Sequence, residues 1–156
     1  MIRVLVGLVL IALSLPAVAQ EDYVEPQIDQ SKVYVSDPAA CQALEQNGVQ
    51  ALFEGEGFTM LSFPRGIDGM EFNCHFFDVK ERKGNRFLFV DAVCELPGEV
   101  YPDTLSISPW DETQIQVVST YDSMMVMSGG MEPPGPTTNP GVTMYTRCDN
   151  LSEIPR

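Results

Sequence analysis

Apolar and polar residues alternate along much of this chain with the period of two that is typical of β-strands. The alternation is clearest in 71–79 and in 86–96, where the even-numbered positions are mostly apolar. Residues 80–85 between them are mainly charged and include Gly84, which suits a turn. Two alternating segments joined by a short polar turn predict an antiparallel β-hairpin.

Further short segments carry β-favouring residues and are separated by turns rich in Gly, Pro or Asp. They are 51–53, 58–63, 103–108, 113–121, 123–128 and 142–148. One helix is predicted over 38–47. Asp37 is a favourable N-cap for it, and Gly48 follows as a stop signal. We therefore predict a mainly β fold with minor α content, an antiparallel β-barrel or sandwich with one N-terminal helix.

The chain opens with the arrangement of a secretory signal peptide. Arg3 gives it a positive start, an uncharged apolar run follows, and Ala17-Val18-Ala19 supplies the small residues that a signal peptidase requires. The apolar run is shorter than the roughly 20 residues that span a bilayer. We predict a signal peptide over 1–19, export to the periplasm or the medium, and no stable membrane insertion after cleavage.

The rest of the chain has the length of one domain. Residues 20–36 are polar and contain Pro26, so we predict an extended N-terminal lead-in there. A single β-rich domain is expected over 37–156. Within it, 128–141 are predicted to form a loop, because this segment is the richest in Pro and Gly.

The charge balance narrows the classes of partner. The chain has 22 acidic residues against 9 Lys and Arg, which gives a formal net charge of −13. Such a chain repels nucleic acid and anionic membranes and attracts basic proteins or cations. In size, charge and predicted compartment it is similar to exported protein inhibitors of cationic hydrolases such as lysozyme, although it matches no inhibitor motif. That similarity implies a binding role rather than a catalytic one.

Four cysteines in an exported chain predict two disulfides, for which the sequence allows three pairings. Cys74 and Cys94 lie near the middle of the two hairpin arms, on the face expected to point into the core. We therefore predict a Cys74–Cys94 bridge, which leaves Cys41 for Cys148. A zinc site is not expected, because no C-x-x-C spacing occurs and His75 is the only histidine. No cofactor is predicted.

Three groups of residues are candidates for a binding surface. Trp110 lies at a predicted turn between strands, where an exposed indole could anchor a partner. The Pro-rich loop and the basic hairpin tip are the other two, and these candidates are Trp110, Pro133, Pro134, Lys80, Arg82 and Lys83. Solvated charge at a hairpin tip is an equally ordinary interpretation of the basic residues.

Methionines crowd the last third of the chain, and thioethers are soft ligands that suit Cu(I). If 123–128 is a strand, Met125 and Met127 share one face, and Met144 approaches from a neighbouring strand. This arrangement would give a speculative Cu(I) site. The alternative is packing, because methionine fills irregular gaps in protein cores.

Catalytic residues are hard to identify in this sequence. It has no G-x-S-x-G motif, its one histidine lies between Cys74 and two phenylalanines, and its many carboxylates make some acidic pair inevitable. We therefore expect a non-catalytic, exported, acidic binding module that recognises a basic protein or an envelope component. The alternatives are a small-ligand or Cu(I) carrier and a carboxylate-based hydrolase.

Overall fold

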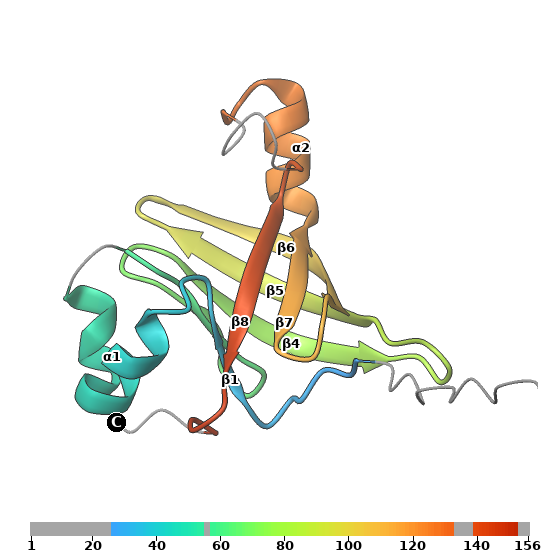
Figure 1. The fold of residues 1–156 in the computed structure, drawn as a ribbon. Coiled ribbons are helices and arrows are strands. Elements are labelled where there is room, and N and C mark those ends of the chain that lie inside the picture. Colours follow the sequence, from blue (N-terminus) through green and yellow to red (C-terminus); the bar gives the residue numbers. More distant parts are fainter. Residues whose placement is uncertain (1–25, 55–56, 133–138, 153–156) are drawn as a thin grey trace, which may run out of the picture.

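The structure of the protein is a computed structural model, and it describes residues 26–54, 57–132 and 139–152. In this part of the chain, eight strands form a closed antiparallel barrel in sequence order, with β1 paired to β8 (Figure 1). The strands are β1 (Val33–Val35), β2 (Met60–Ser62), β3 (Gly66–Asp68), β4 (Asn73–Glu81), β5 (Leu88–Leu96), β6 (Glu99–Pro109), β7 (Gln114–Ser119) and β8 (Val142–Cys148). The prediction of a mainly β fold is confirmed, and of its two forms the structure has the barrel.

The predicted hairpin forms one of the two long ladders of the barrel, between β4 and β5. Cys74 lies directly opposite Cys94 in this ladder, and a disulfide joins them, as predicted. On β5 the buried positions alternate with partly or fully exposed ones, so one face of the strand fills the barrel. The interior cluster comprises Tyr34, Leu61, Phe63, Ile67, Cys74, Leu88, Val90, Ala92, Cys94, Tyr101, Leu105, Ile107, Ile115, Val117 and Tyr145.

A second apolar cluster lies outside the barrel wall, where α1 (Ala40–Asn47) and the 3₁₀ helix η1 (Gly48–Phe53) cover β1 and β2. All three residues of β1 are buried, because Tyr34 joins the interior cluster while Val33 and Val35 join the outer one. A strand covered on both faces is apolar throughout, which explains its short Val-Tyr-Val sequence. Residues 33–35, predicted as the end of an extended lead-in, are thus a strand of the barrel.

The predicted N-terminal helix is present, but two local predictions for this part of the chain were wrong. Asp37 does not cap α1. Its carboxylate accepts a hydrogen bond from the N–H of Ala39 (3.0 Å), and the helix starts only at Ala40. Residues 51–53 were predicted as a strand and belong to η1. Three apolar residues in a row do not distinguish the two, and here Ala51 and Leu52 are buried in the outer cluster.

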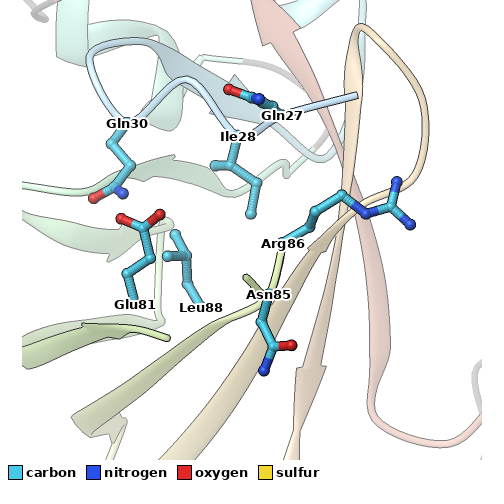
Figure 2. Close-up of a pocket in the computed structure, with 7 residues that line it drawn as sticks. All are labelled: Gln27, Ile28, Gln30, Glu81, Asn85, Arg86 and Leu88. Atoms are coloured by element: carbon cyan, nitrogen blue, oxygen red, sulfur yellow. The ribbon is translucent and has the colours of Figure 1, made fainter. Parts of the chain in front are cut away.

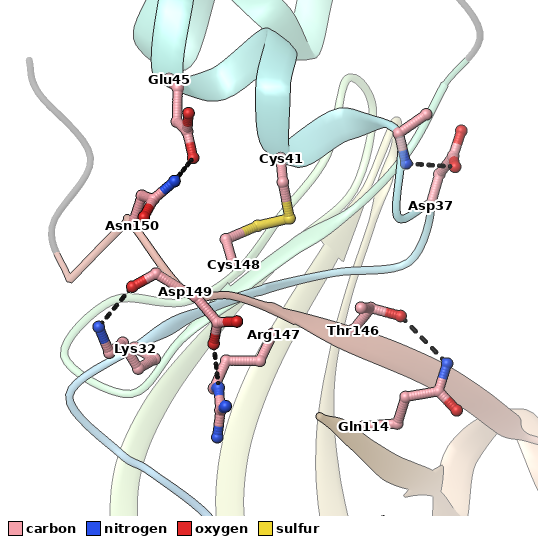
Figure 3. The surroundings of a disulfide bond; sticks show 11 residues. Lys32, Asp37, Cys41, Glu45, Gln114, Thr146, Arg147, Cys148, Asp149 and Asn150 are labelled. Atoms are coloured by element: carbon pink, nitrogen blue, oxygen red, sulfur yellow. Dashed lines mark hydrogen bonds and ion pairs between the residues drawn. A yellow bond between two sulfur atoms is a disulfide. The ribbon is translucent and has the colours of Figure 1, made fainter. Parts of the chain in front are cut away.

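The second disulfide joins Cys41 of α1 to Cys148 at the end of β8, as predicted, with a Cα–Cα distance of 5.4 Å. Figure 3 shows polar contacts around it, including the hydrogen bond from Asn150 Nδ2 to Glu45 Oε1 (3.0 Å). These contacts and the sulfur bridge hold α1 against the barrel wall. The two disulfides indicate that the protein folds in an oxidising environment.

The segment between β7 and β8 contradicts the sequence prediction. Residues 123–128 were predicted as a strand, whereas α2 (Thr120–Ser128) is a helix that stands beyond the strand ends of the barrel (Figure 1). A short run of Met and Val is compatible with a strand or a helix. Here the capping residues at both ends favour the helix. The predicted loop starts one residue too early, because Ser128 is the last residue of α2.

Candidate functional site

Polar groups help to fix the start of α2, beside the apolar contacts that Tyr121 makes with the interior cluster. Ser119 is the N-cap, and its Oγ accepts a hydrogen bond from the N–H of Asp122 (2.9 Å). The same hydroxyl donates to Asp103 Oδ2 on β6 (2.6 Å), and Asp103 Oδ1 accepts from the N–H of Tyr121 (2.9 Å). Strand β6 therefore satisfies N–H groups that a helix N-terminus leaves without partners.

The end of α2 is also closed by backbone hydrogen bonds. Gly129 takes the left-handed conformation (φ 76°), and its N–H bonds to the carbonyl of Val126 (3.1 Å). The N–H of Gly130 bonds to the carbonyl of Met125 (2.9 Å). With both ends secured in this way, the helix exists although none of its residues is buried.

Two of the apolar side chains of α2, those of Met124 and Met127, face solvent. Met124 is 56% exposed and Met127 is 83% exposed, in a helix composed largely of Met, Val and Tyr. Isolated apolar residues on a surface are ordinary, but several large exposed apolar side chains on one short helix are less common. This exposure points to a surface that another molecule covers.

A groove of about 460 Å³ lies between α2 and the outer face of β4, β5 and β6, and we refer to it as the α2 groove. Its walls are mainly apolar, with Met124 on the helix side and Phe77 on the strand side. It is lined by Phe77, Asp91, Ala92, Val93, Pro102, Asp103, Thr104, Thr120, Tyr121 and Met124.

Phe77 lies on the outer face of β4, at a β-bulge. Phe76 pairs with Ala92 and Asp78 pairs with Asp91, so Phe77 is an extra residue without a partner on β5. Phe76 packs against the interior cluster, whereas Phe77 is 70% exposed. Bulges re-aim side chains and occur near functional sites. Here the bulge leaves Phe77 and Asp78 both on the outside of the barrel and returns Val79 to the interior cluster.

The rim of the α2 groove is acidic. Asp91 lines it, Asp78 is paired with Asp91 across the strands, and Glu95 follows further along the exposed side of β5. Glu99 accepts a hydrogen bond from the hydroxyl of Tyr121 (2.5 Å). Lys80 contacts both Asp91 and Asp78, with distances from Nζ of 2.5 and 3.2 Å, and the hydrogen bond to Asp91 raises the pKa of Lys80. One lysine does not neutralise four carboxylates.

The barrel interior opens toward α2 as a cavity of about 40 Å³, lined in part by Asp103, Ser119, Asp122 and Tyr145. The rings of Tyr101 and Tyr121 stack at 3.7 Å on the same side of the barrel. Burial raises the pKa of Tyr145 to about 12, and burial together with the charge of Asp103 raises the pKa of Asp122. This cavity has room for a water molecule or two and none for an organic ligand.

The hydroxyl of Ser119 donates to Asp103, while His75 lies exposed on the outer side of β4. Among the residues that the structure describes, no group of three or more His, Cys, Asp or Glu could hold a metal ion. The arrangement suits binding through shape, apolar contact and charge.

The other candidate residues from the sequence lie away from the α2 groove, apart from Lys80 on its rim. Glu81 pairs with Leu88 and Leu88 with Ile107, so the β4–β5 tip and the β6–β7 turn are at the same end of the barrel. Arg82 and Lys83 are exposed at that tip, and Trp110 is 62% exposed beside the other turn. The α2 helix is at the opposite end. The signal peptide, Pro133 and Pro134 lie outside the described residues.

Figure 2 shows a smaller pocket of about 160 Å³ between the N-terminal segment and β4–β5. Its lining is mainly polar and exposed, except for the buried Leu88 and the partly buried Ile28. Ile28 packs against the interior cluster, and the hydroxyl of Tyr34 donates to the carbonyl of Asp29 (3.0 Å). We interpret the pocket as the edge of the N-terminal segment, which covers the end of the barrel opposite α2.

The premise of the predicted Cu(I) site was wrong, because Met125 and Met127 are on a helix. Residues two apart on a helix point about 200° away from each other, so they do not share a face. Met125 lies against Gly130, whose added Cβ would be 2.7 Å from its terminal carbon. Met144 is partly buried on β8. The structure does not bring these three residues together as a strand would have done.

Sequence reasoning missed the two residues that define the α2 groove, Phe77 and Met124. A signal for each was present. Ser119 followed by an acidic residue three positions later, with Gly129-Gly130 after the apolar run, is the pattern of a capped helix. The adjacent Phe76 and Phe77 break the period-two alternation, as a bulge does.

Comparisons of the chain with protein-family models, curated proteins and solved structures give no match. Within the described residues, no helix combines the length and the apolar character needed to cross a membrane. The fold and the site together define a disulfide-bonded antiparallel barrel with an exposed apolar helix at one end.

Proposed function

We propose that this protein is an exported, non-catalytic binding module that docks a cationic, partly apolar segment of a partner protein in the α2 groove. The observation that carries this proposal is the exposure of Met124 and Met127 on a helix with no buried residue, next to the exposed ring of Phe77. Covering a large apolar side chain contributes about 1.5–3 kcal/mol. Three such side chains supply a substantial driving force for association.

The charge of the surface favours a basic partner. Asp78, Asp91, Glu95 and Glu99 lie around the α2 groove, and the chain as a whole has a net charge of −13. A partner with Lys or Arg beside its apolar residues would meet carboxylates at the rim and methionines at the centre. Methionine side chains adapt to irregular partner surfaces, which suits such a contact.

The compartment of this activity is the periplasm or the medium. Residues 1–19 have the arrangement of a cleavable signal peptide, and both disulfides require oxidation during folding. A basic exported protein or a basic envelope component is therefore the class of partner that the module would encounter.

The test is capture of proteins from native envelope extract and culture medium on the immobilised mature protein with its disulfides intact. The groove variants are Phe77→Ser and the double variant Met124→Ser/Met127→Ser. Two matched controls remove an exposed apolar side chain elsewhere, Phe53→Ser on η1 (58% exposed) and Trp110→Ser at the far end of the barrel (62% exposed).

We expect one basic protein that the wild type and both controls retain, that both groove variants lose, and that elutes as salt rises. Retention by the groove variants at the wild-type level would contradict the proposal. Loss through Trp110→Ser alone would place the binding surface at the opposite end of the barrel.

A further inference from the structure

Two methionines of α2 present their thioethers on the same side of the helix. Met124 and Met127 are three residues apart, a spacing that places side chains about 5–6 Å apart at Cβ on one helix face. Both are more than half exposed, so neither thioether is used in packing. Long flexible side chains in this relation can close on a single ion.

A third thioether returns to the same end of the helix. Met131 follows the Gly129 turn, and its N–H bonds to the carbonyl of Met125 (3.3 Å), which folds the backbone of Met131 back onto the last turn of α2. Its side chain is 40% exposed. The three residues have the spacing Met-x-x-Met-x-x-x-Met in the sequence. Met125 is not counted among them, because its side chain lies against Gly130.

The chemistry of these groups selects a soft cation. Thioethers bind Cu(I) and have little affinity for hard ions such as Mg²⁺ or Ca²⁺. All four cysteines of the chain are in disulfides, which leaves methionine as its source of soft ligands. The net charge of −13 draws cations toward the surface.

We propose that Met124, Met127 and Met131 form a Cu(I) site on the exposed side of α2. The ion binds as Cu(I) and leaves as Cu(I), so no electron is transferred and no co-reactant is needed. The site goes beyond the docking function, because it requires no partner protein. It replaces Met125 and Met144 of the sequence-based set with Met124, which shares a helix face with Met127, and with Met131, whose backbone folds back onto the last turn of α2.

The experiment is an anaerobic titration of the full disulfide-intact mature protein with Cu(I) acetonitrile complex, in competition with a chromophoric Cu(I) chelator. Native mass spectrometry with Ag(I) gives an independent, redox-inert count of bound ions. The test variant is Met124→Leu/Met127→Leu, and the matched control is Met70→Leu, which changes an exposed methionine of the β3–β4 connection (48% exposed).

We expect uptake of one Cu(I) per protein, unchanged in Met70→Leu. Affinity should fall at least about tenfold in the double variant, since losing even a partner of a metal ligand costs about 10- to 100-fold. No uptake by the wild type, or uptake that survives the double variant, would overturn the proposal. An equal loss in Met70→Leu would also overturn it, by showing that binding depends on methionines in general.

The Phe77→Ser variant separates the two proposals, because Phe77 lines the α2 groove and has no thioether. Capture of a basic protein should be lost in this variant, whereas Cu(I) uptake should remain. Failure of Cu(I) uptake with capture intact would remove the metal site alone. Failure of capture with Cu(I) uptake intact would remove the docking function alone.

Discussion

Asp103 of β6 accepts a hydrogen bond from the backbone N–H of Tyr121 in the first turn of α2, with an Oδ1···N distance of 2.9 Å. This contact joins a strand of the barrel to a helix that has no buried residue of its own. The position of α2 therefore depends on a buried carboxylate, a cap and the packing of Tyr121 on Tyr101, and not on its methionines. That is why the methionines of the helix remain available to a ligand or a partner.

Replacing Asp103 should destabilise the protein. Asp103→Ala leaves the N–H groups of Thr104 and Tyr121 and the hydroxyl of Ser119 without their acceptor. Each buried donor left unpaired costs about 1–3 kcal/mol, so we expect a loss of about 2–4 kcal/mol in the free energy of unfolding. Urea denaturation measures it, with the exposed Glu95→Ala as the control. A loss of less than about 0.5 kcal/mol would contradict this role of Asp103.

Two glycines at positive φ near α2 should respond differently to alanine. At Gly129 an added Cβ meets nothing within 4 Å, so Gly129→Ala should cost about 1 kcal/mol, from backbone conformation alone. At Gly141 the Cβ would lie 2.6 Å from the carbonyl oxygen of Ser119 and 2.7 Å from the N of Ser123. We expect Gly141→Ala to be clearly more destabilising in thermal unfolding. Equal effects would show that α2 moves away from residue 141 at little cost.

Stability should depend on pH through Asp122. Burial and the charge of Asp103 raise the pKa of Asp122 above its ordinary value of 3.8, so the folded state binds this proton more tightly than the unfolded state. This contribution to stability is present below the unfolded pKa and is lost as pH rises through the folded pKa.

The variant Asp122→Asn carries no charge to bury. It should therefore be more stable than the wild type at neutral pH, and the difference should vanish below about pH 3, where the wild-type carboxyl is protonated in both states. Urea denaturation across this pH range measures the difference. A less stable variant at neutral pH would mean that attraction of the charge to the helix N-terminus outweighs burial.

The two disulfides should contribute unequally. Cys41–Cys148 closes a loop of 107 residues and Cys74–Cys94 a loop of 20. The chain-entropy model gives about 5 kcal/mol for the longer loop and about 3 kcal/mol for the shorter. Thermal unfolding of the paired alanine variants should therefore show the larger loss for Cys41→Ala/Cys148→Ala. The opposite order would mean that the packing of Cys74 and Cys94 in the barrel interior contributes more than loop length describes.

The barrel and its disulfides could be predicted from the sequence because local alternation reports which side of a strand is buried. Cys74 and Cys94 fall on the apolar face of two alternating arms, and the structure places them opposite each other. The segment 142–148 was predicted with the bounds that β8 has. The inward side chains of these strands all pack in the barrel interior, so the alternation of apolar and polar residues has one structural interpretation.

The candidate site could not be predicted because its residues break those patterns. An exposed run of methionines has the composition of a buried strand, and only the caps at Ser119 and Gly129 distinguish a helix there. Phe77 lies at a β-bulge, where the strict alternation that identifies the two faces of β4 is interrupted. Trp110 was predicted as a binding residue because it is aromatic and lies at a turn. The sequence does not show at which end of the barrel that turn lies.

Docking in the α2 groove is tested most directly by site-specific photo-crosslinking in the living cell envelope. A photoreactive amino acid replaces Met124 on α2 in one variant and Trp110 at the far end of the barrel in the other. Both side chains are more than half exposed, so both probes are accessible. We predict a crosslink from position 124 to one basic exported protein and none from position 110. A crosslink from position 110 with none from position 124 would contradict the account.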